Sequence, residues 1–198
     1  MASTRGWLLL AAGVWVTLVA AAVGFQRPGS GWILAPSADR AIKRLFWKEF
    51  NQTEVWMRLT PRRAQGDGQI PAVLIFSAIL PGNITEPVKS ADAPTQVTIE
   101  AHPDPRAVVT KPTLVLSTPS RRFDFFQMGR ASLLPGCDGC SATAVQARVD
   151  RAAFAALSTD APWTCEVLGF ECRMEPDDVA AMRRFGAAIG FLDARALK

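Results

Sequence analysis

Residues 71–80, PAVLIFSAIL, would be apolar on both faces if the chain were extended. A run of this length predicts a strand at the centre of a sheet, because both of its faces need cover. The segments 53–60 and 95–102 alternate between apolar and polar residues instead, which indicates strands with one buried face. The second of these segments places His102, the one histidine of the chain, on its polar face. Together they predict a sheet with residues 71–80 inside it.

Three further short strands are predicted over 107–118, 122–128 and 143–149. Pro112 lacks the N–H that a sheet ladder needs, so the first of these segments is predicted to be an edge strand or two short pieces. Turn-forming glycine, proline and asparagine residues separate the segments. Short strands at this spacing are typical of an antiparallel, sandwich-like body.

The last third of the chain has a helical pattern around a hairpin. Residues 149–157 predict a short helix, and residues 163–174 predict a hairpin that turns at Leu168 and Gly169. A longer helix is predicted from Pro176, and its apolar stripe consists of Val179, Met182, Phe185 and Ile189. The stripe needs apolar cover, so this helix is predicted to pack on one face of the sheet. The fold class is therefore α+β and mainly β, with one body over residues 53–198.

Residues 6–25, GWLLLAAGVWVTLVAAAVGF, are 20 uncharged residues in a row. A helix of this length rises about 30 Å, which matches the hydrocarbon core of a bilayer. Residues 1–25 are therefore predicted to be a signal anchor or a cleaved signal peptide, and the length of the apolar run favours the anchor. Arg5 directly precedes the run, which favours export of the downstream residues, whereas the lysines and arginines further along favour the opposite orientation.

Basic residues concentrate after this segment, since residues 27–63 hold 8 basic and 3 acidic side chains whereas residues 64–198 hold 13 and 15. Over residues 26–52 we expect a linker and then a basic amphipathic helix, with an apolar stripe that includes Leu45 and Phe50. The helix either lies on anionic lipid head groups or packs on the domain with its basic side in solvent. The membrane-surface candidates are Arg40, Lys43, Arg44 and Lys48. No nucleic-acid partner is expected beside an acidic body.

Four cysteines carry the most distinctive chemistry of the sequence: Cys137, Cys140, Cys165 and Cys172. An even number of cysteines in an oxidising compartment favours two disulfides. A two-residue turn at Leu168 and Gly169 would bring the last two cysteines face to face. That register favours pairing 137 with 140 and 165 with 172 over crossed bridges, although it also places two glutamates opposite each other.

Three other hypotheses concern the same cysteines. A four-thiolate zinc site has the right number of ligands, but the second pair lacks the close spacing of a strong zinc signal. Cys137 and Cys140 form a C-x-x-C that is typical of redox activity, although the residues after it predict a strand and not the required helix. Covalent haem is excluded because Ser141 occupies the position of the required histidine.

The sequence has no nucleophile elbow, no phosphate-binding loop and no dinucleotide-binding glycine motif. We therefore expect a single-pass membrane protein, inserted through residues 6–25, whose domain lies in the periplasm or at the cell exterior. The protein would be secreted if the segment is cleaved. The domain is expected to bind another component of the cell envelope without a cofactor. The alternatives are a thiol-redox or metal-binding (zinc or copper) protein that uses Cys137 and Cys140, and a hydrolase without a recognisable motif.

Overall fold

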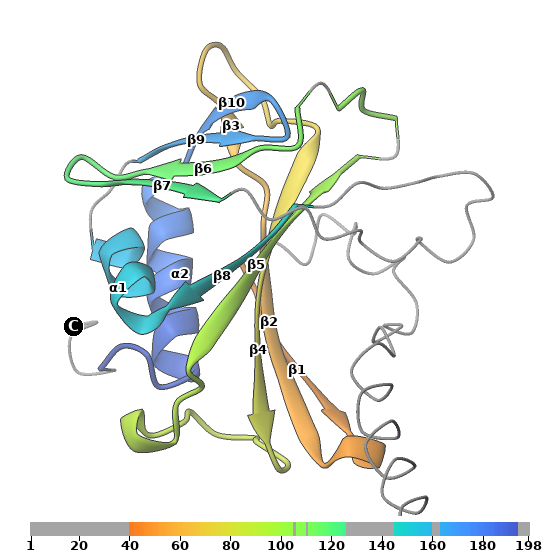
Figure 1. The fold of residues 1–198 in the computed structure, drawn as a ribbon, viewed down its shortest axis with the longest axis vertical. Coiled ribbons are helices and arrows are strands. Elements are labelled where there is room, and N and C mark those ends of the chain that lie inside the picture. The colour runs from red at the N-terminus through yellow and green to blue at the C-terminus, as the bar shows by residue number, and fades with distance from the viewer. Residues whose placement is uncertain (1–39, 105, 110, 126–144, 160–162, 194–198) are drawn as a thin grey trace, which may run out of the picture.

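A computed structural model describes residues 40–104, 106–109, 111–125, 145–159 and 163–193 (Figure 1). Within these ranges the chain is mainly β, with two antiparallel sheets and a C-terminal helix, which confirms the predicted class at this level. The predicted membrane segment 6–25, the linker up to residue 39, and Cys137 and Cys140 lie outside the described residues.

The larger sheet, sheet A, is built around the apolar run at residues 71–80. Its strands in spatial order are β1 (Ile42–Trp47), β2 (Gln52–Leu59), β4 (Ala72–Pro81), β5 (Gln96–Pro103) and β8 (Val145–Asp150). In the centre, Phe76 of β4 is the register partner of Met57 in β2 and of Ile99 in β5, and all three face the core. Val73 and Ile75 on the other face of β4 are buried too, so the predicted central strand is confirmed.

The smaller sheet, sheet B, lies across one end of sheet A (Figure 1). Its strands in spatial order are β3 (Arg62–Arg63), β10 (Phe170–Arg173), β9 (Thr164–Val167), β6 (Leu114–Ser117) and β7 (Arg122–Phe125). Its inner face contributes to the same hydrophobic core as sheet A, through residues such as Leu116, Phe123 and Val167. The two sheets therefore share one core.

Two helices, α1 (Arg151–Thr159) and α2 (Pro176–Ala188), cover the inner face of sheet A (Figure 1). Phe76 of β4 lies between Phe154 of α1 and Phe185 of α2, with ring centroids 6.0–6.5 Å apart in all three pairs. All four residues of the predicted stripe are buried, three of them on α2 and Ile189 at its C-cap. The predicted covering helix is thus confirmed.

The helix predicted between residues 37 and 50 is wrong. Residues 42–47 form β1, which pairs with β2 along its whole length, and only the short 3-10 helix η3 (Lys48–Phe50) comes after it. The apolar residues fit helical spacing, but β2 would have an open edge without β1. Backbone pairing along that edge outweighs the local pattern, as tertiary context commonly does for short segments.

The expectation that Pro112 marks an edge strand or divides two short strands is also wrong, because the described residues of this region form one strand. The strand in that region is short, and β6 begins two residues after the proline, at Leu114. It lies between β9 and β7 inside sheet B. Because Pro112 precedes the strand, its missing N–H removes no hydrogen bond from the sheet.

Candidate functional site

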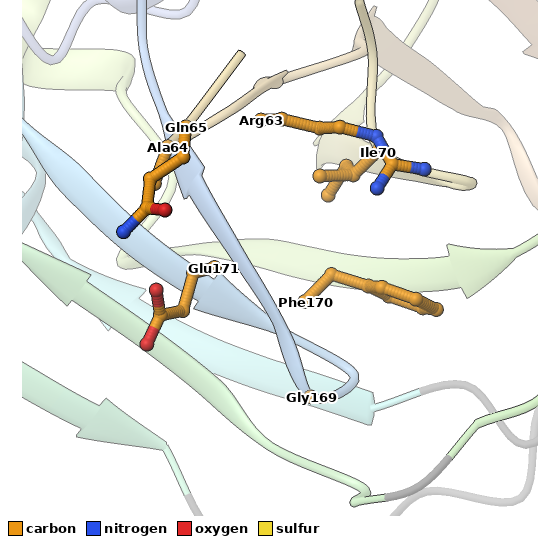
Figure 2. A pocket seen from close by; sticks show the side chains of 7 residues that line it. All are labelled: Arg63, Ala64, Gln65, Ile70, Gly169, Phe170 and Glu171. Atoms are coloured by element: carbon orange, nitrogen blue, oxygen red, sulfur yellow. The ribbon is translucent and has the colours of Figure 1, made fainter.

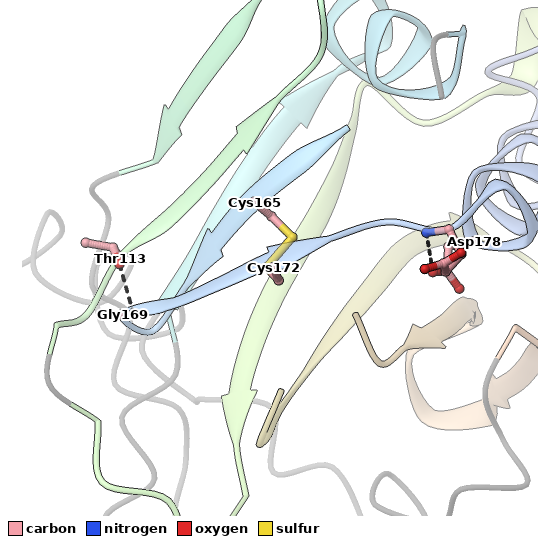
Figure 3. Close-up of a disulfide and its surroundings, with 6 residues drawn as sticks. Thr113, Cys165, Gly169, Cys172 and Asp178 are labelled. Atoms are coloured by element: carbon pink, nitrogen blue, oxygen red, sulfur yellow. Dashed lines mark hydrogen bonds between the residues drawn. A yellow bond between two sulfur atoms is a disulfide. The ribbon is translucent and has the colours of Figure 1, made fainter. Parts of the chain in front are cut away.

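The β9–β10 hairpin joins two of the four cysteines in a disulfide (Figure 3). Cys165 and Cys172 are register partners and are bonded to each other. The turn residues Leu168 and Gly169 have φ angles of 54° and 85°, as a two-residue type I′ turn requires. Both of their N–H groups donate to Thr113, one to its carbonyl at 2.7 Å and one to its hydroxyl at 3.2 Å. The predicted bridge between residues 165 and 172 is confirmed.

This bond bears on the metal hypotheses. Because the sulfurs of Cys165 and Cys172 are bonded to each other, these residues do not supply thiolates. The disulfide is therefore incompatible with a zinc site made of all four cysteines. In the part of the chain that the structure describes, no three His, Cys, Asp or Glu side chains are placed to hold a metal ion. Cys137 and Cys140 lie outside that part, so their pairing and their redox or metal chemistry stay predictions.

The hairpin register arranges charged side chains in two rows on the outer face of sheet B. One row is acidic apart from a valine and runs through Asp124, Val115, Glu166 and Glu171. The neighbouring row is basic or polar and runs through Arg122, Ser117, Thr164, Arg173 and Arg62. We call these nine residues the charged face. Its six ionisable side chains are exposed or half-buried.

Ion pairs order the basic row. The Nε atom of Arg122 donates to both carboxylate oxygens of Asp124, at 2.9 and 3.0 Å. This hydrogen bond, together with the charge of Asp124, raises the pKa of Arg122 above its ordinary value. At the other end, Arg173 and Arg62 both approach Oε1 of Glu175, with Nε–Oε1 distances of 3.2 and 3.7 Å.

The acidic row contains a like-charge pair, since Glu166 and Glu171 are register partners across the hairpin. The Thr113 hydroxyl donates to Oε1 of Glu166 at 3.0 Å. That hydrogen bond orients one carboxylate, while Glu171 is exposed to solvent. Opposed like charges destabilise a strand pair in isolation. The hairpin keeps this register because its turn, its disulfide and the Thr113 contacts all require it.

An open depression of about 310 Å³ adjoins the charged face, where the loop after β3 passes the hairpin (Figure 2). It is lined by Arg63, Ala64, Gln65, Ile70, Gly169, Phe170 and Glu171. Figure 2 shows Gln65 and Glu171 on one side, and Arg63 and Phe170 on the other. The Ala64 N–H donates to the carbonyl of Glu171 at 3.1 Å, which fixes the loop against the hairpin. The depression thus combines polar walls with one aromatic wall.

His102 lies on the outer face of sheet A, as the alternation predicts, but it is buried. Its Nε2 atom is 2.9 Å from Oε2 of Glu100, whose other oxygen accepts a hydrogen bond from Gln146 at 3.4 Å. Ser77 on the same face pairs with Thr98, four residues along β5 from His102, or about 13 Å away. That separation is too large for a serine–histidine catalytic pair. We therefore assign the cluster to the structure of the sheet.

The basic membrane-surface candidates divide into two groups. Lys43, Arg44 and Lys48 are exposed, on a segment that runs to the end of sheet A opposite sheet B (Figure 1). Arg40 pairs with α2 instead, through a 2.7 Å hydrogen bond from its Nε atom to Asp178. The structure therefore keeps three of the four residues on β1 and η3 and separates the fourth. Lys43 lies on the outer face of sheet A, whereas Arg44, the partner of Val55, lies on the opposite face.

Three apolar side chains are exposed on or near the same segment. The helix hypothesis had assigned Leu45 and Phe50 to a buried stripe, and Ile79 belongs to the predicted central strand. Leu45, Phe50 and Ile79 have exposed fractions of 37%, 56% and 50%. Leu45 and Ile79 flank Glu54 in one row across β1, β2 and β4, and Phe50 ends η3. We call the resulting surface the tip, and it consists of Lys43, Arg44, Leu45, Lys48, Phe50 and Ile79.

The chain matches no protein-family model, no curated protein and no solved structure. None of the helices within the described ranges is long and apolar enough to cross a bilayer.

Proposed function

We propose that the protein is a membrane-anchored extracytoplasmic binding module that recognises a protein partner of the cell envelope through the charged face of sheet B. The observation that carries the proposal is the arrangement of this face. Three acidic and three basic side chains stand in adjacent rows of opposite sign on an open sheet surface. The central part of sheet A, in contrast, is buried on both faces.

The disulfide supports the proposed location. Structural disulfides form and persist in the periplasm, at the cell surface and in secreted proteins, where the environment is oxidising. Cys165 and Cys172 are bonded in the hairpin that carries part of both charged rows. Residues 6–25 supply the proposed single-pass anchor, and the module is secreted if that segment is cleaved.

The charge pattern favours a protein partner. The two rows carry equal numbers of acidic and basic side chains, so a polymer of uniform charge gains little net attraction from this face. A protein that presents the opposite order of charges gains at both rows, and such complementarity provides specificity and register. The adjoining depression, with Phe170 on one wall and Glu171 on the other, offers room for one side chain of such a partner.

In-cell photocrosslinking tests the recognition surface. A photoreactive phenylalanine analogue at Thr164, in the middle of the charged face, should form an adduct of one discrete mass. The matched position is Ala91, which is exposed on η4 (Ser90–Asp92) in the loop after β4 and should form none.

A charge swap tests whether the crosslink depends on the arrangement of charges in the two rows. The double variant Arg122→Asp/Asp124→Arg preserves the net charge and the local ion pair but exchanges the two signs between the rows. It should weaken the adduct at position 164 at least five-fold. An adduct of undiminished yield in this variant, or an adduct from position 91 alone, would show that the charged face is not the recognition surface.

Membrane extraction tests the anchor separately. The full chain should stay in the membrane pellet after alkaline carbonate treatment, and its intact mass should include residues 1–25. If the protein is instead soluble and begins near Phe25, residues 1–25 are a cleaved signal peptide and not an anchor.

A further inference from the structure

We propose that the tip of sheet A docks on the head groups of an anionic lipid bilayer. The proposal rests on the proposed function in one respect, because it takes the membrane that holds the anchor as the docking surface. It adds a second, reversible contact and the residues that make it.

The charge of the tip is complementary to anionic lipid. Residues 42–54 contain three basic side chains, Lys43, Arg44 and Lys48, and two acidic ones, Glu49 and Glu54, of which Glu54 is buried. All three basic side chains are exposed, and Lys43 is held on the outer face of the sheet with its ammonium 5.9 Å from the centroid of the Trp56 ring. Basic side chains close to an anionic membrane each strengthen binding, and the effect extends over about a Debye length.

The apolar side chains of the tip complement the interfacial region below the head groups. Leu45, Phe50 and Ile79 are three of the four large apolar residues that are exposed in the described part of the chain. Peripheral membrane surfaces combine such side chains with lysine and arginine, because the apolar groups enter the acyl boundary while the cations remain at the phosphates. The tip has both sets within one end of one sheet.

The tip is also held in a fixed shape. The turn after β4 is tied to the start of β2, since the Gly82 N–H donates to the carbonyl of Asn51 at 2.7 Å. The hydroxyl of Thr53 donates to the carbonyl of Gly82 at 2.7 Å and accepts from the N–H of Ile84 at 2.8 Å. These bonds join the two turns, so docking would order few additional residues and lose little conformational entropy.

The length of chain before β1 allows the tip to reach the membrane. Fourteen residues, 26–39, separate the predicted anchor from Arg40, and they span at most about 50 Å even when fully extended. Tethering over such a distance raises the effective concentration of the tip at the bilayer. With the tip on the membrane, sheet B would project away from it, because the two lie at opposite ends of the domain (Figure 1).

A second copy of the chain would be a poorer partner for the tip than anionic lipid. Face-to-face contact would place the three cations of one tip against those of the other. Stable interfaces also bury about 1,200–2,000 Å² in total, which three partly exposed apolar side chains on each copy do not provide. Anionic lipid satisfies the cations and the apolar groups together.

Lysine reactivity in nanodiscs tests the proposal on the full chain. The protein is reconstituted in phosphatidylcholine alone or with about one third phosphatidylglycerol, and acetylation of each lysine is followed by mass spectrometry. Lys43 and Lys48 should react at least five-fold more slowly in the anionic discs, and high salt should remove the difference. Lys111, exposed before β6, serves as the internal control and should react equally in both.

Variants that leave the lysines in place separate the contribution of the basic side chains to docking from that of the apolar side chains. Arg44→Gln should weaken docking about five-fold, whereas Arg106→Gln, the same change at an exposed site outside the tip, should not. The double variant Phe50→Ser/Ile79→Ser should restore much of the lysine reactivity in anionic discs, although it keeps every charge. These apolar groups are already partly exposed, so their replacement leaves the core intact.

The outcomes for the anchor and for docking are distinct. If the chain inserts into both kinds of disc and Lys43 and Lys48 react equally in them, docking is overturned while the anchor stands. If the chain fails to insert but co-sediments with anionic vesicles and not with neutral ones, the anchor is overturned while docking stands. If Lys43 and Lys48 are protected from acetylation as strongly in Arg44→Gln as in the parent, the proposed charge complementarity is also overturned.

Discussion

Arg40 and Asp178 join the beginning of the described chain to the amino end of α2. The guanidinium Nε donates to the Asp178 carboxylate at 2.7 Å, and that carboxylate, only 2% exposed, also accepts the backbone N–H of Glu175 at 2.9 Å. Asp178 is thus the third residue of α2, where it completes a capping box with the N-cap residue Glu175, and it is also the partner of a distant arginine. The contact holds the segment before β1 against α2 and explains why Arg40 does not belong to the tip.

The double role of Asp178 makes it a sensitive position. Asp178→Ala removes a helix-capping hydrogen bond and leaves the guanidinium of Arg40 without this partner, so the free energy of unfolding should fall by about 2–3 kcal/mol. Asp177→Ala is the matched control, because Asp177 has 82% exposure and lies 3.4 Å from the same guanidinium. It should change stability by about 0.5 kcal/mol or less. Urea unfolding of the detergent-solubilised chain measures both, and equal effects would contradict the assigned role.

The Cys165–Cys172 bridge should stabilise the domain although it closes a small loop. Seven positions separate the cysteines, and the chain-entropy model gives about 2.5 kcal/mol for a loop of that size. Cys165→Ala/Cys172→Ala should therefore lower the unfolding midpoint in urea. Reductant should lower the midpoint of the parent toward that of the variant. A variant as stable as the parent would mean that the hairpin contacts with Thr113 hold the register without the bond.

The hairpin and the central strand were predictable because their signals are local. A continuous apolar run needs cover on both faces, and Leu168 with Gly169 fits a two-residue turn that sets the pairing of every residue in the hairpin. The stripe on α2 was equally local, since its four apolar residues recur on one face of a single helix.

The two proposed surfaces were not predictable because they depend on pairing between distant segments. Ile79 becomes a neighbour of Leu45 only when β1 and β4 both pair with β2, and the local pattern around Leu45 predicted a helix. The charged rows likewise take residues from five strands of sheet B. The local charge of residues 27–63 did indicate a basic surface, but it included Arg40, whose partner is more than 130 residues away.

The opposed glutamates predict a variant that is more stable than the parent. Glu171→Gln removes the repulsion from Glu166 while it keeps the shape of the side chain and leaves the hydrogen bond from Thr113 in place. The free energy of unfolding should rise by about 0.2–1 kcal/mol at neutral pH and low salt. The gain should shrink in high salt, which screens exposed charges. Glu86→Gln, at an exposed position after β4, is the control, and a loss of stability in Glu171→Gln would contradict a repulsive pair.

Gly190 and Gly66 form a matched pair that separates backbone strain from steric contact. Their φ angles are 77° and 79°, so alanine at either position is strained by about 1 kcal/mol or more. A Cβ at Gly190 would also lie 2.8 and 2.9 Å from the carbonyl oxygens of Lys89 and Val88, whereas one at Gly66 meets nothing within 4 Å. Gly190→Ala should therefore lower the thermal midpoint clearly more than Gly66→Ala. Equal shifts would show that the loop before η4 can move away from the end of α2, and a larger shift at Gly66 would contradict the close packing at Gly190.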